Sequence, residues 1–186
     1  MAPRRVVVVD TETTGTSHAD RVVSVAAVEL LDYRFGGVLH LVFNPGRRNH
    51  WAAYKAHGLS DAFLADQPSF AEHAAEVWDF IGDAVVVGHN VGFDDRMLRQ
   101  EFALAGYPSP GWALHCTMKS WRGLFPGRPS SLDACCGAFG LGRTTAVHGA
   151  LEDALLCACL YQALERAPVQ PMPPLTPFSN LRVPAL

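Results

Sequence analysis

RVVVVDTETTG, residues 5–15, is the stretch of sequence that decides the fold of this 186-residue chain. Its four consecutive valines indicate a strand that is buried on both faces, as in the middle of a sheet. Residues two apart on an extended chain point to the same side, so Asp10 and Glu12 are predicted to converge where this strand ends. The carboxyl end of a central strand is also where open α/β sheets place their ligands.

Two carboxylates held this close repel each other and raise each other's pKa. A divalent cation removes the conflict, and oxygen ligands suit Mg²⁺ or Mn²⁺. Two other interpretations stay open at this point. Asp, Thr and Gly also form ordinary turns and helix caps. Phosphatases of the haloacid dehalogenase type likewise carry two acids at alternate positions after a first strand, although both are aspartates there and Glu12 departs from that pattern.

Composition limits the class of protein. Hydrophobic residues make up 49% of the chain and charged residues 18%, which predicts a globular domain, expected at residues 1–167. Residues 168–186 are rich in proline and are expected to form an extended or disordered tail. No apolar run approaches the roughly 20 residues of a membrane helix, and the N-terminus enters a strand directly, so we expect a cytoplasmic protein without a membrane contact.

Cysteine count and net charge exclude further classes. The five cysteines include no C-x-x-C pair, so neither a disulfide framework nor a zinc site is indicated, and we expect small buried thiols. The net charge of the chain is −3, so we do not expect the broad basic surface of a duplex-binding protein. Any contact with nucleic acid is therefore expected to be local and partly mediated by metal ions.

The order of the predicted elements indicates a mixed sheet. Strands are expected at 5–9, 21–30 and 38–43, and the short link at 32–37 predicts an antiparallel hairpin. Residues 47–67 are expected to be irregular. A capping box at Ser69 and Glu72 opens a helix. The remaining elements are strands at 85–87 and 113–116 and helices at 93–105, 119–124, 132–139 and 150 to about 167. This order predicts an α/β fold with five strands, the first three antiparallel and the others parallel, flanked by helices.

A second acidic cluster, HNVGFDD at residues 89–95, lies between a predicted buried strand and a helix, which is the same kind of position as the first. Asp94 falls in the first helical turn, where a carboxylate also interacts favourably with the helix dipole. Asp94 and Asp95 differ by about 100° around the helix, so only one of them is expected to face a site.

A third cluster, HGALED at residues 148–153, places Asp153 in an apolar helix. An unpaired carboxylate costs several kcal/mol there, so Asp153 needs a metal ion or, as a weaker reason, the helix dipole. Glu152 is expected to point to solvent. His148 is expected in the loop just before the helix, where Gly149 lets it move over the site.

Taken together, the three clusters resemble the exonuclease motifs of the DEDDh family, whose members are 3′→5′ exonucleases with a ribonuclease-H-like fold. The matching motifs are Asp10-x-Glu12-Thr13-Thr14-Gly15, His89-Asn90-x-x-Phe93-Asp94 and His148-x-Ala150-x-x-Asp153. The resemblance covers residues 5 to about 165. Within the family, the chain is similar to the epsilon-type proofreading subunits of bacterial DNA polymerase III, in stretches such as HGLSDAFL (57–64), FPGRPSSLDA (125–134) and HGALEDA (148–154).

The resemblance implies roles for particular residues. It implies that two divalent cations, Mg²⁺ or Mn²⁺, are held by Asp10, Glu12, Asp94 and Asp153. It implies that His148 is the general base, a task that suits a side chain exchanging protons near neutral pH. The residues implied near the terminal nucleotide are Thr13, His57, Asn90 and Phe93. Candidate phosphate contacts are Arg96, Arg99, Lys119, Arg122 and Arg128.

The implied activity is the release of 5′-mononucleotides from single-stranded or frayed 3′ ends of DNA, as in proofreading. A replicative DNA polymerase catalytic subunit is the implied partner. The chain ends in a proline-rich tail with no evident clamp-binding motif, so a free-standing DNA-repair or RNA-processing exonuclease stays open as an alternative. A scaffold that binds nucleic acid or a polymerase without cleaving is less favoured, because a binder has no need for so costly a cluster of acids.

Overall fold

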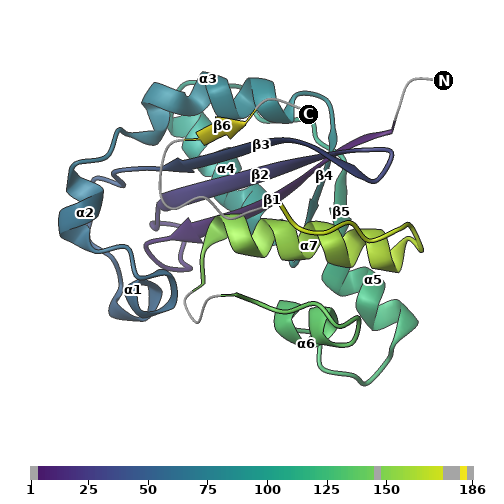
Figure 1. The fold of residues 1–186 in the computed structure, drawn as a ribbon. Coiled ribbons are helices and arrows are strands. Elements are labelled where there is room, and N and C mark those ends of the chain that lie inside the picture. The colour runs from purple at the N-terminus through teal and green to yellow at the C-terminus, as the bar shows by residue number, and fades with distance from the viewer. Residues whose placement is uncertain (1–3, 145–147, 174–180, 184–186) are drawn as a thin grey trace.

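The computed structural model describes residues 4–144, 148–173 and 181–183, the last three by their backbone alone. Its sheet has the strand order β5-β4-β1-β2-β3-β6, with β1 in the interior (Figure 1). The strands β1, β2 and β3 are antiparallel neighbours, whereas β4 and β5 run parallel to β1. The predicted arrangement of three antiparallel strands followed by parallel ones is therefore confirmed. The bounds of the strands are Arg5–Thr13 (β1), Val22–Leu31 (β2), Arg34–Val42 (β3), Val85–Gly88 (β4), Leu114–Cys116 (β5) and Leu181–Val183 (β6).

The hairpin between β2 and β3 is tighter than the sequence predicts. Asp32 and Tyr33 both adopt left-handed backbone angles, with φ of 47° and 64°, which allows a two-residue turn that matches the twist of the sheet. As a result β3 begins at Arg34 and takes in the two glycines that were expected in the connection. Gly36 fits there because a Cβ at this position would lie 2.5 Å from the carboxylate of Glu29.

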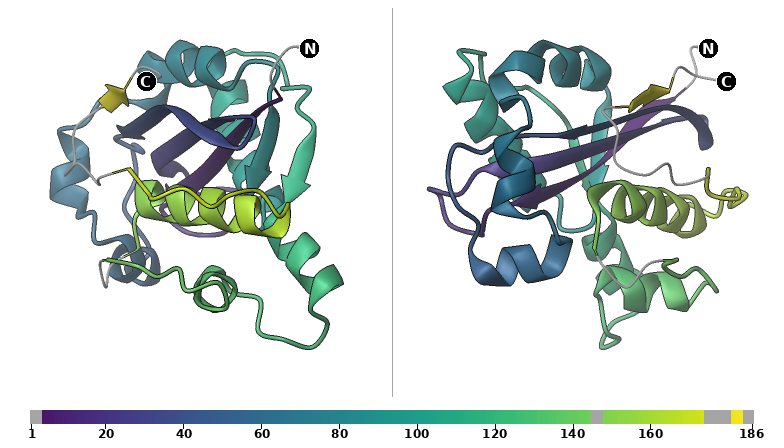
Figure 2. Two further views of the ribbon diagram at one scale, coloured as in Figure 1. Left: turned by 45° about the vertical axis from the view of Figure 1, so that its right-hand side comes forward. Right: turned by 60° about the vertical axis from the view of Figure 1, so that its left-hand side comes forward.

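The helices form layers on both faces of the sheet (Figures 1 and 2). Side chains of β1 alternate between them: Val7 and Val9 pack with α3 and α4, whereas Val6 and Val8 pack against α7. This alternation also decides where the polar residues after Val9 point. The bounds of the helices are Trp51–His57 (α1), Asp61–Ala65 (α2), Phe70–Ile81 (α3), Gly92–Leu104 (α4), Thr117–Leu124 (α5), Leu132–Gly137 (α6) and Ala150–Leu164 (α7).

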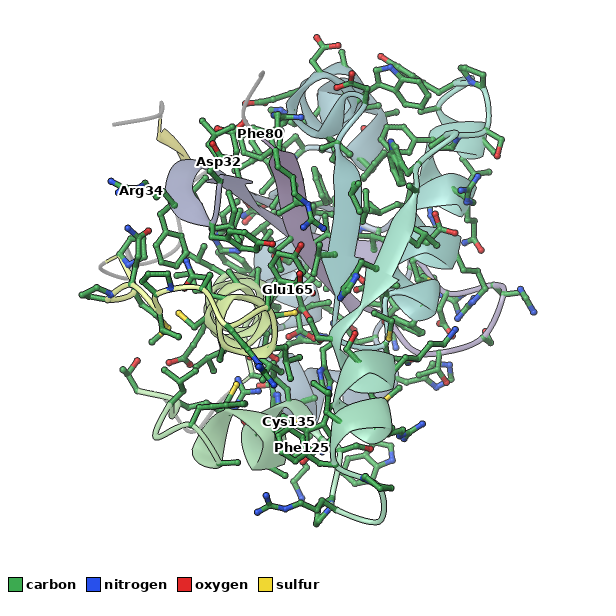
Figure 3. All side chains as sticks on the ribbon, turned by 90° about the vertical axis from the view of Figure 1, so that its right-hand side faces the viewer. Asp32, Arg34, Phe80, Phe125, Cys135 and Glu165 are labelled. Carbon is green, nitrogen blue, oxygen red and sulfur yellow. The ribbon has the colours of Figure 1, made fainter. Side chains whose placement is uncertain are left out.

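The helices α5 and α6 cover the outer side of α7 through a third apolar cluster. Trp121, Cys135 and Leu160 are buried in it, and Phe125 packs against its edge (Figure 3). Four of the five cysteines of the chain are buried and Cys116 is partly buried, and all five are free thiols. The prediction of small buried cysteines is therefore confirmed for four of the five. Burial on both sides explains why α7 is apolar nearly all round.

Residues 47–67 are not irregular throughout, which corrects the prediction for this segment. Two short helices, α1 and α2, lie here. Gly58 ends α1 in the left-handed conformation, with φ of 72°, and donates its backbone N–H to the carbonyl of Tyr54. Ser60 then caps α2 by accepting from the backbone N–H of Phe63. Helices this short carry too little apolar periodicity to be recognised from sequence.

The described part of the proline-rich segment lies against the domain. The Gln170 side chain accepts a hydrogen bond from the backbone N–H of Phe35, and Met172 packs beside α7. The strand β6 pairs with the edge strand β3 in antiparallel register. None of the helices in the described ranges combines the length and the apolar character needed to cross a bilayer.

Candidate active site

Three of the predicted acids meet at the end of β1. Asp10, Glu12 and Asp153 each offer a carboxylate oxygen, and these oxygens lie within 4.8 Å of one another. Asp10 and Glu12 share the face of β1 that packs on α7, as their spacing of two predicts, and Asp153 lies in the first turn of α7. The ladder between β1 and β2 shifts register at Glu12 and Thr13, a local irregularity of the kind often found beside active sites.

Burial makes this cluster electrostatically unfavourable for the polypeptide alone. Loss of water raises the pKa of Glu12 to about 8, and the charges of Asp153 and Asp94 add to the effect. Loss of water likewise raises the pKa of Asp10 well above its usual range, followed by repulsion from Asp94 and Asp153. Three crowded, desolvated carboxylates with oxygens this close form the donor set that hard divalent cations prefer. The residues present therefore fit such an ion.

Asp94 reaches β1 from the opposite face of the sheet. It is buried in the first turn of α4, and its Oδ1 accepts hydrogen bonds from the backbone N–H and the hydroxyl of Thr11, at 3.0 and 2.8 Å. Burial raises the pKa of Asp94 to about 7, although the Thr11 hydrogen bonds oppose this. Asp94 is not among the three acids whose oxygens converge, yet its charge acts on Asp10 and Glu12.

Two further acids, Asp95 and Glu152, lie next in sequence to Asp94 and Asp153 and were both expected to point away from the site. Asp95 turns away from Asp94 and accepts from Nε of Arg99 at 2.8 Å, as the 100° rotation between adjacent helical residues predicts. Glu152 does not point to solvent as expected. It is buried, and its Oε1 accepts from the backbone N–H and the hydroxyl of Thr144, at 2.6 and 2.7 Å.

Arg143 is a residue of the site that sequence reasoning missed. Its guanidinium binds Oδ1 of Asp153 and also donates to Oδ1 of Asp133 at 2.6 Å. The charge of Arg143 lowers the pKa of both Asp10 and Glu12, but less than burial raises it. A positive residue five positions before His148 was the signal available in the sequence, but no periodicity connects this loop residue with Asp153, which lies ten residues later in a helix.

His148 lies beside the acids, in the loop before α7, as predicted. Its Nδ1 is 3.3 Å from Oδ2 of Asp153, so Arg143 and His148 occupy the two oxygens of this carboxylate. The backbone N–H of His148 donates to the carbonyl of Ala56, which ties this loop to α1. About half of the His148 side chain is exposed to solvent, so the imidazole has access to water.

A cavity of about 640 Å³ opens next to Glu12. It brings together three of the four residues predicted near a nucleotide, Thr13, His57 and Phe93, from β1, α1 and α4. His57 is buried, and its Nδ1 accepts from the backbone N–H of Leu59 at 3.0 Å. Because Nδ1 accepts this hydrogen bond, the proton of the neutral ring is on Nε2. Burial favours the neutral form by lowering the pKa of His57, and a hydrogen bond to the Thr13 backbone partly opposes this.

Asn90, the fourth predicted residue, is exposed and does not line this cavity. It holds the turn between β4 and α4 in the left-handed conformation, with φ of 74°, which asparagine adopts more readily than most residues. Its carbonyl accepts from the backbone N–H of Phe93 at 2.9 Å. Asn90 therefore shapes the backbone that presents Phe93, and a contact with the nucleotide stays a prediction.

Comparison with known proteins gives consistent matches. A family model described as Exonuclease (RNase_T) matches residues 7–161. The DNA polymerase III subunit epsilon of Escherichia coli K12 is 35% identical over 172 residues, which cover 86% of this chain and 71% of that protein. The protein of the same name from Rickettsia prowazekii is 36% identical over 172 residues, covering 88% and 75%.

A solved structure supports the same relationship. Exonuclease X, in complex with 5′-overhanging duplex DNA, superposes with a TM-score of 0.69 at 26% identity. The match covers 87% of this chain and 91% of that one, so nearly the whole of both folds corresponds.

Proposed function

The chain belongs to the exonuclease family and is a 3′→5′ exonuclease, and on that premise we propose how its residues act and on what. We propose that it releases 5′-mononucleotides from single-stranded or frayed 3′ ends of DNA. The convergence of Asp10, Glu12 and Asp153 at the end of β1 is the observation that carries this proposal. The roles assigned below to single residues are part of it.

Asp10, Glu12, Asp94 and Asp153 are the proposed ligands of two divalent cations, Mg²⁺ or Mn²⁺. The raised pKa of Asp10, Glu12 and Asp94 supports this assignment, because a bound cation stabilises each ionised carboxylate. Arg143 lowers the pKa of Asp10 and Glu12 in the same way, but less than burial raises it. When bound, the ions would lower the pKa of the attacking water and stabilise the leaving oxygen. The charges of Asp94, Asp153 and Glu12 all act on Asp10, so Asp10 is the acid that both ions could share.

His148 is the proposed general base. With its Nδ1–H directed at Oδ2 of Asp153, the neutral imidazole keeps a lone pair on Nε2 that can take a proton from water. Asp153 also stabilises the imidazolium that forms, because its carboxylate is within 3.3 Å. The half-exposed side chain can then return the proton to solvent.

The cavity lined by Thr13, His57 and Phe93 is the proposed site of the terminal nucleotide. The Phe93 ring offers an apolar face for a base, and the Nε2–H of His57 is a donor for a sugar or phosphate oxygen. An unpaired end fits best, because a base held in a duplex is not free to stack against a side chain.

Proofreading within a replicative polymerase complex is the proposed setting, because curated relatives at about 35% identity carry the name of a polymerase subunit. A pull-down of this chain with a replicative polymerase catalytic subunit tests that setting separately from the chemistry.

The activity itself is tested with 5′-labelled single strands of matched DNA and RNA sequence, in Mg²⁺, in Mn²⁺ and in EDTA. We expect a ladder that shortens from the 3′ end of DNA in either ion and an intact strand in EDTA. Asp94→Asn should remove the ladder. Asp95→Asn is the matched control, because Asp95 pairs with Arg99 and turns away from the acids, and it should leave the ladder unchanged. Faster cleavage of RNA would reassign the substrate, and no cleavage in either ion would end the proposal.

A further inference from the structure

Trp51 is the most exposed of the large apolar side chains in the described part of the chain. It is the first residue of α1, 74% of it is accessible to solvent, and it lines the same cavity as Glu12 and His57. The free energy falls when a large aromatic ring leaves water, so a ring that stays exposed at the edge of a functional cavity indicates a ligand with a flat apolar face.

Two aromatic rings of this cavity each carry a cation. The Lys55 Nζ lies 5.6 Å from the ring centre of Trp51, and the Arg96 Cζ lies 5.2 Å from that of Phe93. Both rings line the cavity, from α1 and from α4. Aromatic faces for bases, combined with positive charges for the backbone, are what proteins use to bind single-stranded nucleic acid.

The position of Trp51 along α1 is several ångströms from His57, which lines the proposed site of the terminal nucleotide. Trp51 and His57 are the first and last residues of this helix, so they lie about 9 Å apart along its axis. His57 is buried beside Thr13 at the inner end of the cavity, whereas Trp51 is exposed. Successive bases of a strand are spaced by about 3.4 Å when stacked, so this span corresponds to about two to three nucleotides.

We propose that Trp51 stacks on a base of the substrate strand, about two to three nucleotides from its 3′ end, and that Lys55 contacts a neighbouring phosphate. The inference rests on the proposed function, since the strand enters through the cavity beside Glu12. It goes further by giving the exonuclease a second point of attachment, which contributes to strand binding without touching the bond that is cut.

Steady-state kinetics of the first excision from a 5′-labelled thymidine decanucleotide test the inference. We expect Trp51→Ala to raise KM about tenfold with kcat unchanged, because stacking holds substrate and transition state equally. Trp51→Phe should recover most of the loss. Tyr54→Ala is the matched control. Tyr54 is exposed on the same helix but does not line the cavity, so its removal should leave KM at the wild-type value.

A dinucleotide substrate separates the two nucleotide positions, because it ends before it reaches Trp51. Wild-type enzyme and Trp51→Ala should therefore cleave it with the same KM.

Tryptophan fluorescence in EDTA provides a readout that does not depend on cleavage. Trp121 is buried, and Trp78 and Trp112 pack against the core, so quenching by the decanucleotide should come from Trp51 and disappear in Trp51→Phe.

An equal KM for the decanucleotide in wild-type enzyme and Trp51→Ala, or unchanged quenching in Trp51→Phe, would overturn the inference. The proposed function would stand in either case, since cleavage from the 3′ end is measured in the same assay. An equal loss with the dinucleotide would place Trp51 at the terminal nucleotide and contradict the assigned position.

Discussion

Two sets of carboxylates in the interior of this protein, one fully buried and the other partly buried, differ in how their charge is compensated. Glu101 on α4 is 1% exposed and accepts from Nε and Nη2 of Arg21 and from the backbone N–H of Val22, at 2.7 to 3.0 Å. At the end of β1, by contrast, the pKa of Glu12 is raised to about 8 and that of Asp10 lies well above its usual range. The same chemical group is satisfied in one region and crowded in the other.

This difference distinguishes an acid that stabilises the fold from acids that serve a functional site. A buried acid with a matched cation and backbone donors holds the fold together, as Glu101 does between α4 and β2. Acids that are desolvated and mutually repelling raise the free energy of the folded chain, so they need a ligand to explain their presence. The largest expected effects of mutation are therefore on activity in the acidic cluster and on stability at Glu101.

Asp10→Ala is expected to have the largest effect. We predict that exonuclease activity falls to background, because the central acid of the cluster is lost together with the cations it would hold. Circular dichroism should show an unchanged fold. Strand cleavage and Mn²⁺ binding measured on the same sample check this, and full activity in the variant would remove Asp10 from the metal site.

His148→Ala should lower kcat by about 10²–10⁴-fold, the usual contribution of a general base. Mn²⁺ binding should survive, because the acids remain. Rapid-quench measurement of a single excision distinguishes the chemical step from product release. A variant that turns over at the wild-type rate would contradict the role given to the imidazole.

Glu101→Gln should destabilise the fold by about 2 kcal/mol, because removal of one partner leaves Arg21 without its counter-ion in a partly buried position. Urea unfolding in EDTA measures the change, and exonuclease activity below the unfolding transition should be retained. If the variant is as stable as the wild type, the ion pair between Glu101 and Arg21 does not stabilise the fold, and the contrast with the acids of the site fails.

Glu12→Gln is expected to change stability with the opposite sign. In EDTA it should stabilise the fold by about 1 kcal/mol, since the folded chain no longer has to bury a charge in a repelling cluster or take up a proton that neutralises it. The comparison of two Glu→Gln variants in one urea experiment is the sharpest contrast between the two regions. Destabilisation by Glu12→Gln in EDTA would show that the cluster is not under electrostatic stress.

The pH dependence of stability tests the same electrostatic repulsion without a mutation. The folded pKa of Glu12, about 8, lies above the ordinary value of 4.5, so the folded state takes up this proton first as pH falls. In EDTA, stability should therefore increase as the pH falls from about 9 to about 6.5, and Asp94, whose pKa is raised to about 7, adds to the increase in the same direction. Thermal unfolding measures the slope, which should shrink in Glu12→Gln and in saturating Mg²⁺.

The sequence predicts those parts of the site that follow from the repeat of a strand or of a helix. A spacing of two brings Asp10 and Glu12 to one face of β1, and the helical rotation separates Asp94 from Asp95. Contacts that join a loop to a distant element carry no such period. The pairing of Arg143 with Asp153 is therefore invisible before the structure is known.

Local backbone chemistry accounts for the remaining differences in the fold. The two-residue turn at Asp32 and Tyr33 uses left-handed angles without glycine, so the start of β3 is not marked in the sequence. The helix α1 is only seven residues long and ends at Gly58, and it still supplies His57 and Trp51 to the cavity. Glu152 is drawn inward by Thr144, a partner that only the folded loop provides.

Anomalous diffraction from crystals grown with Mn²⁺ and a 5′-mononucleotide tests the central claim most directly. We predict two manganese peaks, one among the carboxylates of Asp10, Glu12 and Asp153 and the other between Asp10 and Asp94, with the nucleotide base against Phe93. Manganese bound elsewhere, or no peak at the end of β1 under conditions in which the enzyme is active, would contradict the account.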